Sequence, residues 1–132
     1  MILGRYIRSS QMSTQVAKGD TCASACVLVL SSGVKRIPIG DVVVHSFFSP
    51  DVLGTNDFSR AERIYTSMSE AVSSYLKEMR VSSLLLEEMI RIPHFKSRKL
   101  EMDELIKLGL LGIDPVYAQA RGQAGTQIPF KK

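Results

Sequence analysis

The residues best suited to chemistry in this chain are Ser24 and His45. Ser24 lies in the stretch Cys-Ala-Ser-Ala-Cys, and His45 ends a β-branched run of three valines. A serine hydroxyl becomes a nucleophile when a neighbouring histidine removes its proton, and histidine, with an ordinary pKa of roughly 6.5, can do this near neutral pH. Spacing alone does not identify such a pair. The alternative interpretation is that Ser24 caps a helix and that His45 has a structural role.

The segments around these two residues predict a parallel α/β fold. The expected elements, in chain order, are the end of a helix at 2–7, a strand at 14–17, a helix from about Cys22 to Ser32, and strands at 36–39 and 41–47. Alternation of helices and strands favours a parallel sheet with flanking helices. Ser24 is expected in the first turn of its helix, where unpaired N–H groups and a partial positive charge would face an oxyanion.

Two of these motifs together resemble the core of the ClpP/crotonase superfamily. The first is Cys-Ala-Ser-Ala-Cys-Val-Leu-Val-Leu-Ser-Ser-Gly-Val-Lys-Arg and the second is Val-Val-Val-His-Ser-Phe. The chain looks most like bacterial ClpP-like serine peptidases, often associated with the envelope, that carry a Cys-x-Ser-x-Cys nucleophile turn. The resemblance implies Ser24 as the nucleophile, His45 as the general base, the backbone N–H of Ala25 as an oxyanion donor, and a Gly-x-x-Arg turn from Gly33 to Arg36.

The chain departs from this family at two positions. In relatives, a strand ending in Gly-Gly supplies a second oxyanion N–H, but the sequence contains no Gly-Gly pair. We therefore expect a chain that is short at its N-terminus and weak or inactive as an enzyme. The Asp that orients the base in relatives would fall near Ser97 or Arg98, and neither is a carboxylate. Asp103 and Glu101 are nearby acids, although acids there are typical of a helix start. A backbone or water partner for His45 is the remaining alternative.

A long amphipathic helix is expected after the histidine strand. Apolar residues keep the i, i+3, i+4 rhythm from Ala61 to Met79, and Ser59 and Glu62 match a capping box. The resemblance implies that this helix, at about 60–80, is a handle through which copies of the chain associate as a homo-oligomer. The alternative is a helix laid on the sheet.

The rest of the chain predicts one domain and a tail. Two shorter helices are expected, at 84–92 and 103–108, followed by a last strand or turn at 110–114. The ClpP-like α/β domain is assigned to residues 1–114. Residues 115–132 are expected to form a flexible C-terminal tail, because much of this stretch is small and polar.

Composition excludes several other function classes. The 132 residues suffice for one core, and the 45% hydrophobic and 23% charged residues are ordinary for a globular chain. The net charge of +4 is scattered, so a nucleic-acid interface is not expected. No apolar run approaches the roughly 18 residues of a membrane span. The first residues do not match a signal peptide.

The two cysteines do not match a metal or redox motif. Cys22 and Cys26 lack the further ligands of a zinc site and the spacing of a Cys-x-x-Cys pair, and no metal or cofactor is expected. On one helix they would share a face, which allows a disulfide in an oxidising compartment. The preferred interpretation is two small buried hydrophobic residues. The resemblance implies a periplasmic or envelope location for a full-length form, and the cytoplasm is the alternative.

These observations lead to two functional hypotheses. The first is a ClpP-like serine hydrolase, a peptidase acting on a peptide or protein. The second is a non-catalytic module of the same fold that binds peptides or partner subunits.

Overall fold

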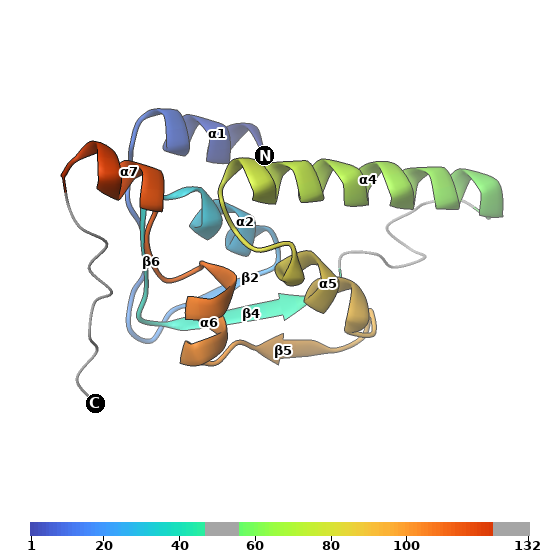
Figure 1. Ribbon diagram of the computed structural model, residues 1–132. Coiled ribbons are helices and arrows are strands. Elements are labelled where there is room, and N and C mark those ends of the chain that lie inside the picture. Colours follow the sequence, from blue (N-terminus) through green and yellow to red (C-terminus); the bar gives the residue numbers. More distant parts are fainter. Residues whose placement is uncertain (47–55, 123–132) are drawn as a thin grey trace.

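The computed structural model describes residues 1–46 and 56–122 (Figure 1). Over these residues the chain is a mixed α/β protein with six helices and two three-stranded sheets. The elements are α1 (Ile2–Ser9), β1 (Thr14–Val16), β2 (Thr21–Ala23), α2 (Ala25–Ser32), β3 (Lys35–Pro38), β4 (Asp41–His45), α4 (Phe58–Glu78), α5 (Leu84–Arg91), β5 (Ser97–Lys99), α6 (Met102–Leu108), β6 (Gly112–Ile113) and α7 (Pro115–Ala120).

The first four strands form one β–α–β unit, in which a bend separates β1 from β2 and another separates β3 from β4. β1 and β2 lead into α2, and β3 and β4 follow it. β1 pairs with β3 and β2 pairs with β4, both in parallel. At the second bend, a Cβ on Gly40 would lie 2.3 Å from the carbonyl oxygens of Ala17 and Asp20, so only glycine lets the two backbones approach this closely. The bends divide the paired strands between the two sheets.

Each sheet also contains an antiparallel pair. β6 pairs with β3, and β5 pairs with β4. The α/β class is therefore confirmed, but the expectation of an all-parallel sheet was wrong. Strand β5 was missed because its sequence, Ser-Arg-Lys, contains no apolar residue. Charged residues are typical of an edge strand, and Lys99 of β5 pairs with Asp41 of β4 at 2.6 Å.

The sheet β2-β4-β5 buries one face. Cys22, Val42 and Val44 are at most 1% exposed, and both α2 and α5 contact β4. The opposite face carries the exposed side chains of Thr21, Ala23, Asp41, Ser97 and Lys99. Among the described residues, this outer face is therefore exposed to solvent.

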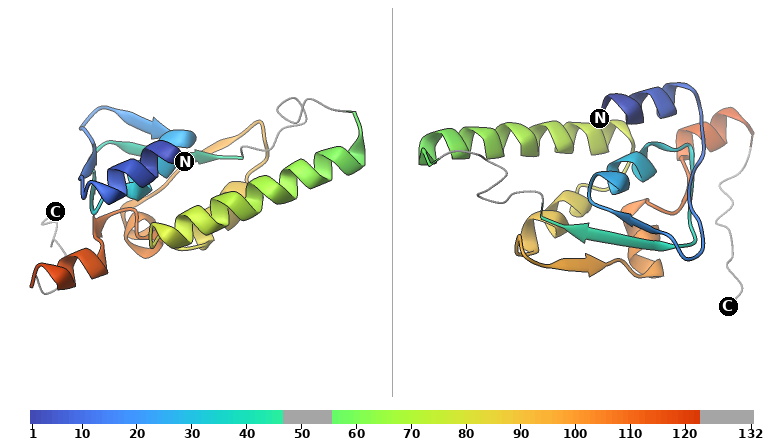
Figure 2. Two further views of the ribbon diagram at one scale, coloured as in Figure 1. Left: turned by 90° about the horizontal axis from the view of Figure 1, so that it is seen from above. Right: turned by 180° about the vertical axis from the view of Figure 1, so that it is seen from behind.

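Helix α4 lies on the body at one end and projects at the other. Its buried residues are Val72, Tyr75 and Leu76, all near its C-terminal end. Its N-terminal part extends beyond the rest of the molecule in every view (Figures 1 and 2). The helix begins after Asp57, whose side chain accepts a hydrogen bond from the N–H of Arg60 at 3.1 Å. The predicted capping box at Ser59 and Glu62 was therefore wrong.

The C-terminal elements extend the folded body further than expected. The helices predicted at 84–92 and 103–108 are confirmed as α5 and α6. Residues 115–120, assigned to the tail, form α7, which Asp114 caps and which buries Ala118. The rest of the predicted tail, from residue 123, lies outside the described residues. None of the described helices combines the length and the hydropathy needed to span a bilayer.

Arg36, the last residue of the Gly-x-x-Arg turn, links the C-terminal ends of α2, α4 and α6. Its side chain is buried and donates to the carbonyl oxygens of Gly33 at 3.0 Å, Met79 at 2.6 Å, and Gly109. Met79 and Gly109 end α4 and α6, where the helix dipoles favour a cation. Burial, together with the neighbouring Arg8 guanidinium, lowers the pKa of Arg36 to about 10. Arg36 thereby holds the start of β3 against the ends of α4 and α6.

Candidate active site

Ser24 lies in the turn between β2 and α2. The expected helix from Cys22 was wrong at its start, because residues 21–23 form a strand paired with β4 and α2 begins at Ala25. The backbone of Ser24 has φ 57° and ψ −124°. Among the described residues, the other non-glycine residues with positive φ are Gln11 and Arg80, and both follow helix ends. A strained serine between a strand and a helix is typical of a nucleophile turn.

The Ser24 hydroxyl does not cap the helix that follows it. Ser24 occupies the N-cap position of α2, but no hydrogen bond joins its side chain to the amides of the helix, so the expected side-chain cap is not formed. The N–H of Val27 is bonded to the carbonyl of Ser24 at 3.0 Å, whereas the N–H groups of Ala25 and Cys26 donate to no described residue. The start of α2 therefore presents, next to Ser24 in the chain, two N–H groups that no described residue accepts from, as a helix N-terminus does.

The parallel pairing of β2 and β4 places Ser24 and His45 at the same end of the two strands. β2 and β4 run in parallel with Ala23 opposite Val43, and neighbouring strands lie about 4.8 Å apart. Ser24 directly follows the first strand, and His45 ends the second. No hydrogen bond joins the hydroxyl to the imidazole in this structure. Such bonds are often long before a substrate binds.

The backbone orients His45. Its Nδ1 lies 2.8 Å from the carbonyl oxygen of Ser46. Because a carbonyl can only accept, Nδ1 carries the proton and the lone pair of the neutral ring is on Nε2. Of the three kinds of partner that the sequence left open, the structure therefore shows the backbone one.

The two candidate acids have structural roles. Glu101 and Glu104 form a reciprocal capping box at the start of α6, and Asp103 lies in its first turn. The strand pairing instead places Ser97 of β5 directly opposite His45, where side chains face the same side of the sheet. Arg98, the other position expected for the orienting acid, binds Glu104 and Glu88.

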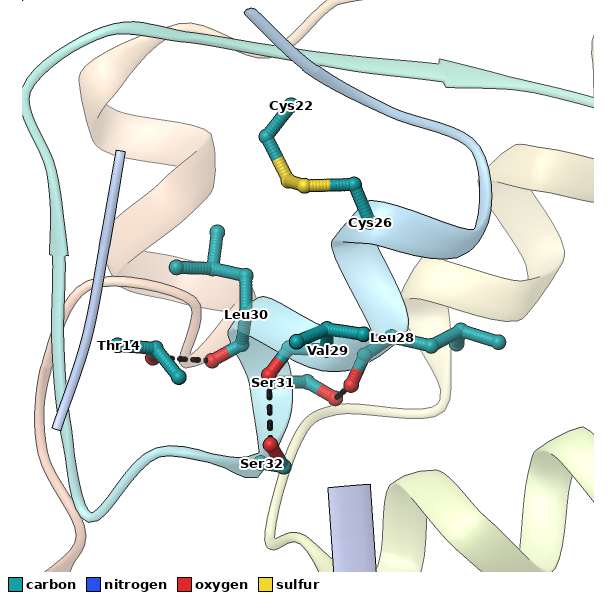
Figure 3. Close-up of a disulfide and its surroundings, with 8 residues drawn as sticks. All are labelled: Thr14, Cys22, Cys26, Leu28, Val29, Leu30, Ser31 and Ser32. Carbon is teal, nitrogen blue, oxygen red and sulfur yellow. Dashed lines mark hydrogen bonds between the residues drawn. A yellow bond between two sulfur atoms is a disulfide. The ribbon is translucent and has the colours of Figure 1, made fainter. Parts of the chain in front are cut away.

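A disulfide links the strand and the helix on either side of Ser24 (Figure 3). Cys22 on β2 and Cys26 on α2 are bonded, with their Cα atoms 5.2 Å apart. The preferred expectation of two separate buried hydrophobic residues was wrong. Cys22 is 1% exposed, but Cys26 lies at the surface. The expected location of the pair was also wrong, since the boundary between β2 and α2 lies between the two residues.

Two cavities are lined by described residues away from the Ser24 turn. One cavity, of about 370 Å³, lies at the end of α4, and another, of about 330 Å³, lies between α1 and α7. Neither is lined by Ser24 or His45. Comparisons of the chain with protein-family models, curated proteins and solved structures find no match, and its function is therefore inferred from the residues above.

Proposed function

We propose that this chain is a ClpP-like serine hydrolase that cleaves peptide or protein substrates. Ser24 is the nucleophile, His45 is the general base, and the N–H of Ala25 stabilises the oxyanion. The single observation that carries the proposal is the backbone of Ser24, held at φ 57° between β2 and α2 with a hydroxyl that does not cap the helix. A serine with only a capping role would adopt negative φ and bond the helix amides.

The geometry supports a two-step acyl transfer. His45 Nε2 takes the proton of the Ser24 hydroxyl as Oγ attacks the carbonyl carbon, and the negative oxygen faces the unpaired amides of α2. The imidazolium then protonates the leaving amine. Water, deprotonated by His45, releases the acyl group from Oγ.

The carbonyl of Ser46 replaces the carboxylate of a serine protease triad only in part. It holds the Nδ1–H tautomer but brings no negative charge to the imidazolium. Disabling the carboxylate of a serine protease triad costs on the order of 10⁴-fold in kcat. We therefore expect slow turnover, and covalent labelling is a better first assay than peptide hydrolysis.

A second candidate is a non-catalytic module that binds peptides or partner subunits. The observation in its favour is the projecting part of α4, where Ile64, Tyr65 and Met68 are partly exposed along one stripe. A homo-oligomer through this helix is compatible with either function. The disulfide favours an oxidising compartment such as the periplasm, since disulfides are rare in the cytosol.

A fluorophosphonate probe tests the first candidate. We expect the full chain to be labelled once, at Ser24, with labelling lost in Ser24→Ala and strongly slowed in His45→Gln. Ser59→Ala, which removes an exposed hydroxyl on α4, is the matched control and should label like the unmodified chain. Absence of labelling, or labelling that persists in Ser24→Ala, would favour the binding module.

A further inference from the structure

We propose that the Cys22–Cys26 disulfide is a redox-sensitive site that controls the conformation of Ser24. In the oxidised form the disulfide holds the serine in its positive-φ turn. Reduction by a dithiol releases the turn and lowers the reactivity of the hydroxyl. The effect on reactivity rests on the proposed hydrolase function, whereas the effect on the backbone does not.

Packing alone does not hold this turn. Along the chain, the buried residues nearest to Ser24 are Cys22, which is 1% exposed, and Val27, which is 0% exposed. Between them, Ala23, Ala25 and Cys26 are exposed and Ser24 is partly exposed. The Ser24 side chain adds no capping hydrogen bond to α2. The side chains of the turn therefore give little resistance to a change of backbone conformation.

The remaining restraints lie at its two ends. The β2–β4 ladder ends at Ala23, and the first bond of α2 joins the N–H of Val27 to the carbonyl of Ser24. Strained backbone conformations persist only where the surrounding structure enforces them. The disulfide is the one covalent restraint that joins the strand to the helix across Ser24. Without it, Ser24 can relax to negative φ and rotate its hydroxyl away from the sheet edge.

The two sulfur atoms are unequally accessible. Cys22 faces the core and Cys26 lies at the surface near the start of α2. A thiolate of the dithiol attacks Cys26 Sγ, the disulfide breaks, and Cys22 leaves as a thiolate that takes up a proton. The second thiol then attacks the reductant's own sulfur in the mixed disulfide and releases Cys26. The dithiol becomes a disulfide and the protein gains two thiols. The N-terminus of α2 stabilises the departing Cys26 thiolate.

The test compares the full chain before and after reduction with dithiothreitol. The readouts are the rate of fluorophosphonate labelling at Ser24 and the amide hydrogen exchange of Val27, whose N–H is bonded to Ser24. A misplacement of about 1 Å can cost on the order of a hundredfold in rate. We expect labelling to slow at least about tenfold and Val27 to exchange faster, both reversed by reoxidation.

The double variant Cys22→Ala/Cys26→Ala is the matched control. It should label and exchange like the reduced chain and should not respond to dithiothreitol. If it does not fold, reversible reduction of the unmodified chain decides. Labelling rates within twofold of each other in the two redox forms, or unchanged exchange at Val27, would overturn the inference. Absent labelling in the oxidised form would instead refute the hydrolase function, and the exchange of Val27 would then decide the inference alone.

Discussion

Replacing Ser24 with glycine should stabilise the protein while abolishing its proposed reactivity. A residue with a Cβ in a conformation such as φ 57° and ψ −124° costs about 1–3 kcal/mol. Glycine adopts positive φ without this steric penalty. Glycine also loses more backbone entropy on folding, by roughly 0.5–1 kcal/mol. With the middle of each range, the net increase in the free energy of unfolding is about 1 kcal/mol.

The matched comparison is Ser24→Ala, which removes the hydroxyl but keeps the Cβ. The free energies of unfolding are measured by urea denaturation followed by circular dichroism, with the disulfide intact. Ser24→Ala should lie within about 0.5 kcal/mol of the unmodified chain, as most surface substitutions do. The Tm of Ser24→Gly should be a few degrees higher, since about 1 kcal/mol corresponds to roughly 2–8 °C for domains of such sizes.

A specific result would refute this reasoning. If Ser24→Gly is no more stable than Ser24→Ala, the turn stores no strain. The backbone evidence for a nucleophile would then be lost. If Ser24→Gly is more stable and both variants lose labelling, the hydroxyl is held in an unfavourable conformation that serves its reactivity.

Two further predictions concern the scaffold. Burial alone would raise the pKa of Asp114, but the amide of Tyr117 and the guanidinium groups of Arg80 and Arg8 outweigh it and hold the pKa below 3.8. The stability that Asp114 provides is therefore present above pH 3.8 and lost as the pH falls through its lower native pKa. Asp114→Asn should lower the free energy of unfolding by about 3 kcal/mol at pH 7. In urea denaturation between pH 5 and 2, the free energy of unfolding of the variant should fall less steeply with pH than that of the unmodified chain. Gly4→Ala should lower Tm, since its Cβ would lie 1.8 Å from the Tyr75 hydroxyl. The expected cost of about 1–3 kcal/mol exceeds the helix-propensity gain of about 1 kcal/mol, and a rise in Tm would contradict the packing described.

Local periodicity in the sequence was sufficient to predict much of the fold. Four predicted elements are confirmed as α1, β1, α5 and α6: the helical turns at 2–7, the strand at 14–17, and the helices stopped by Pro93 and by Gly109. Helices and buried strands of this kind show in the sequence because their apolar faces repeat at a fixed spacing. The strand that ends in His45 was also predicted, but the strand directly before Ser24 was not, because residues 22–24 were assigned to the helix.

The decisive features of the site came only from the tertiary structure. The strand β5 has no apolar residue, so only its pairing with β4 reveals it and brings Ser97 opposite His45. The disulfide joins Cys22 on a strand to Cys26 on a helix, and the sequence left open whether the two cysteines are bonded. The positive φ of Ser24 arises where the β2 ladder ends and α2 turns away from the sheet. Sequence periodicity reports which faces are buried, whereas these features depend on how distant segments constrain the backbone between them.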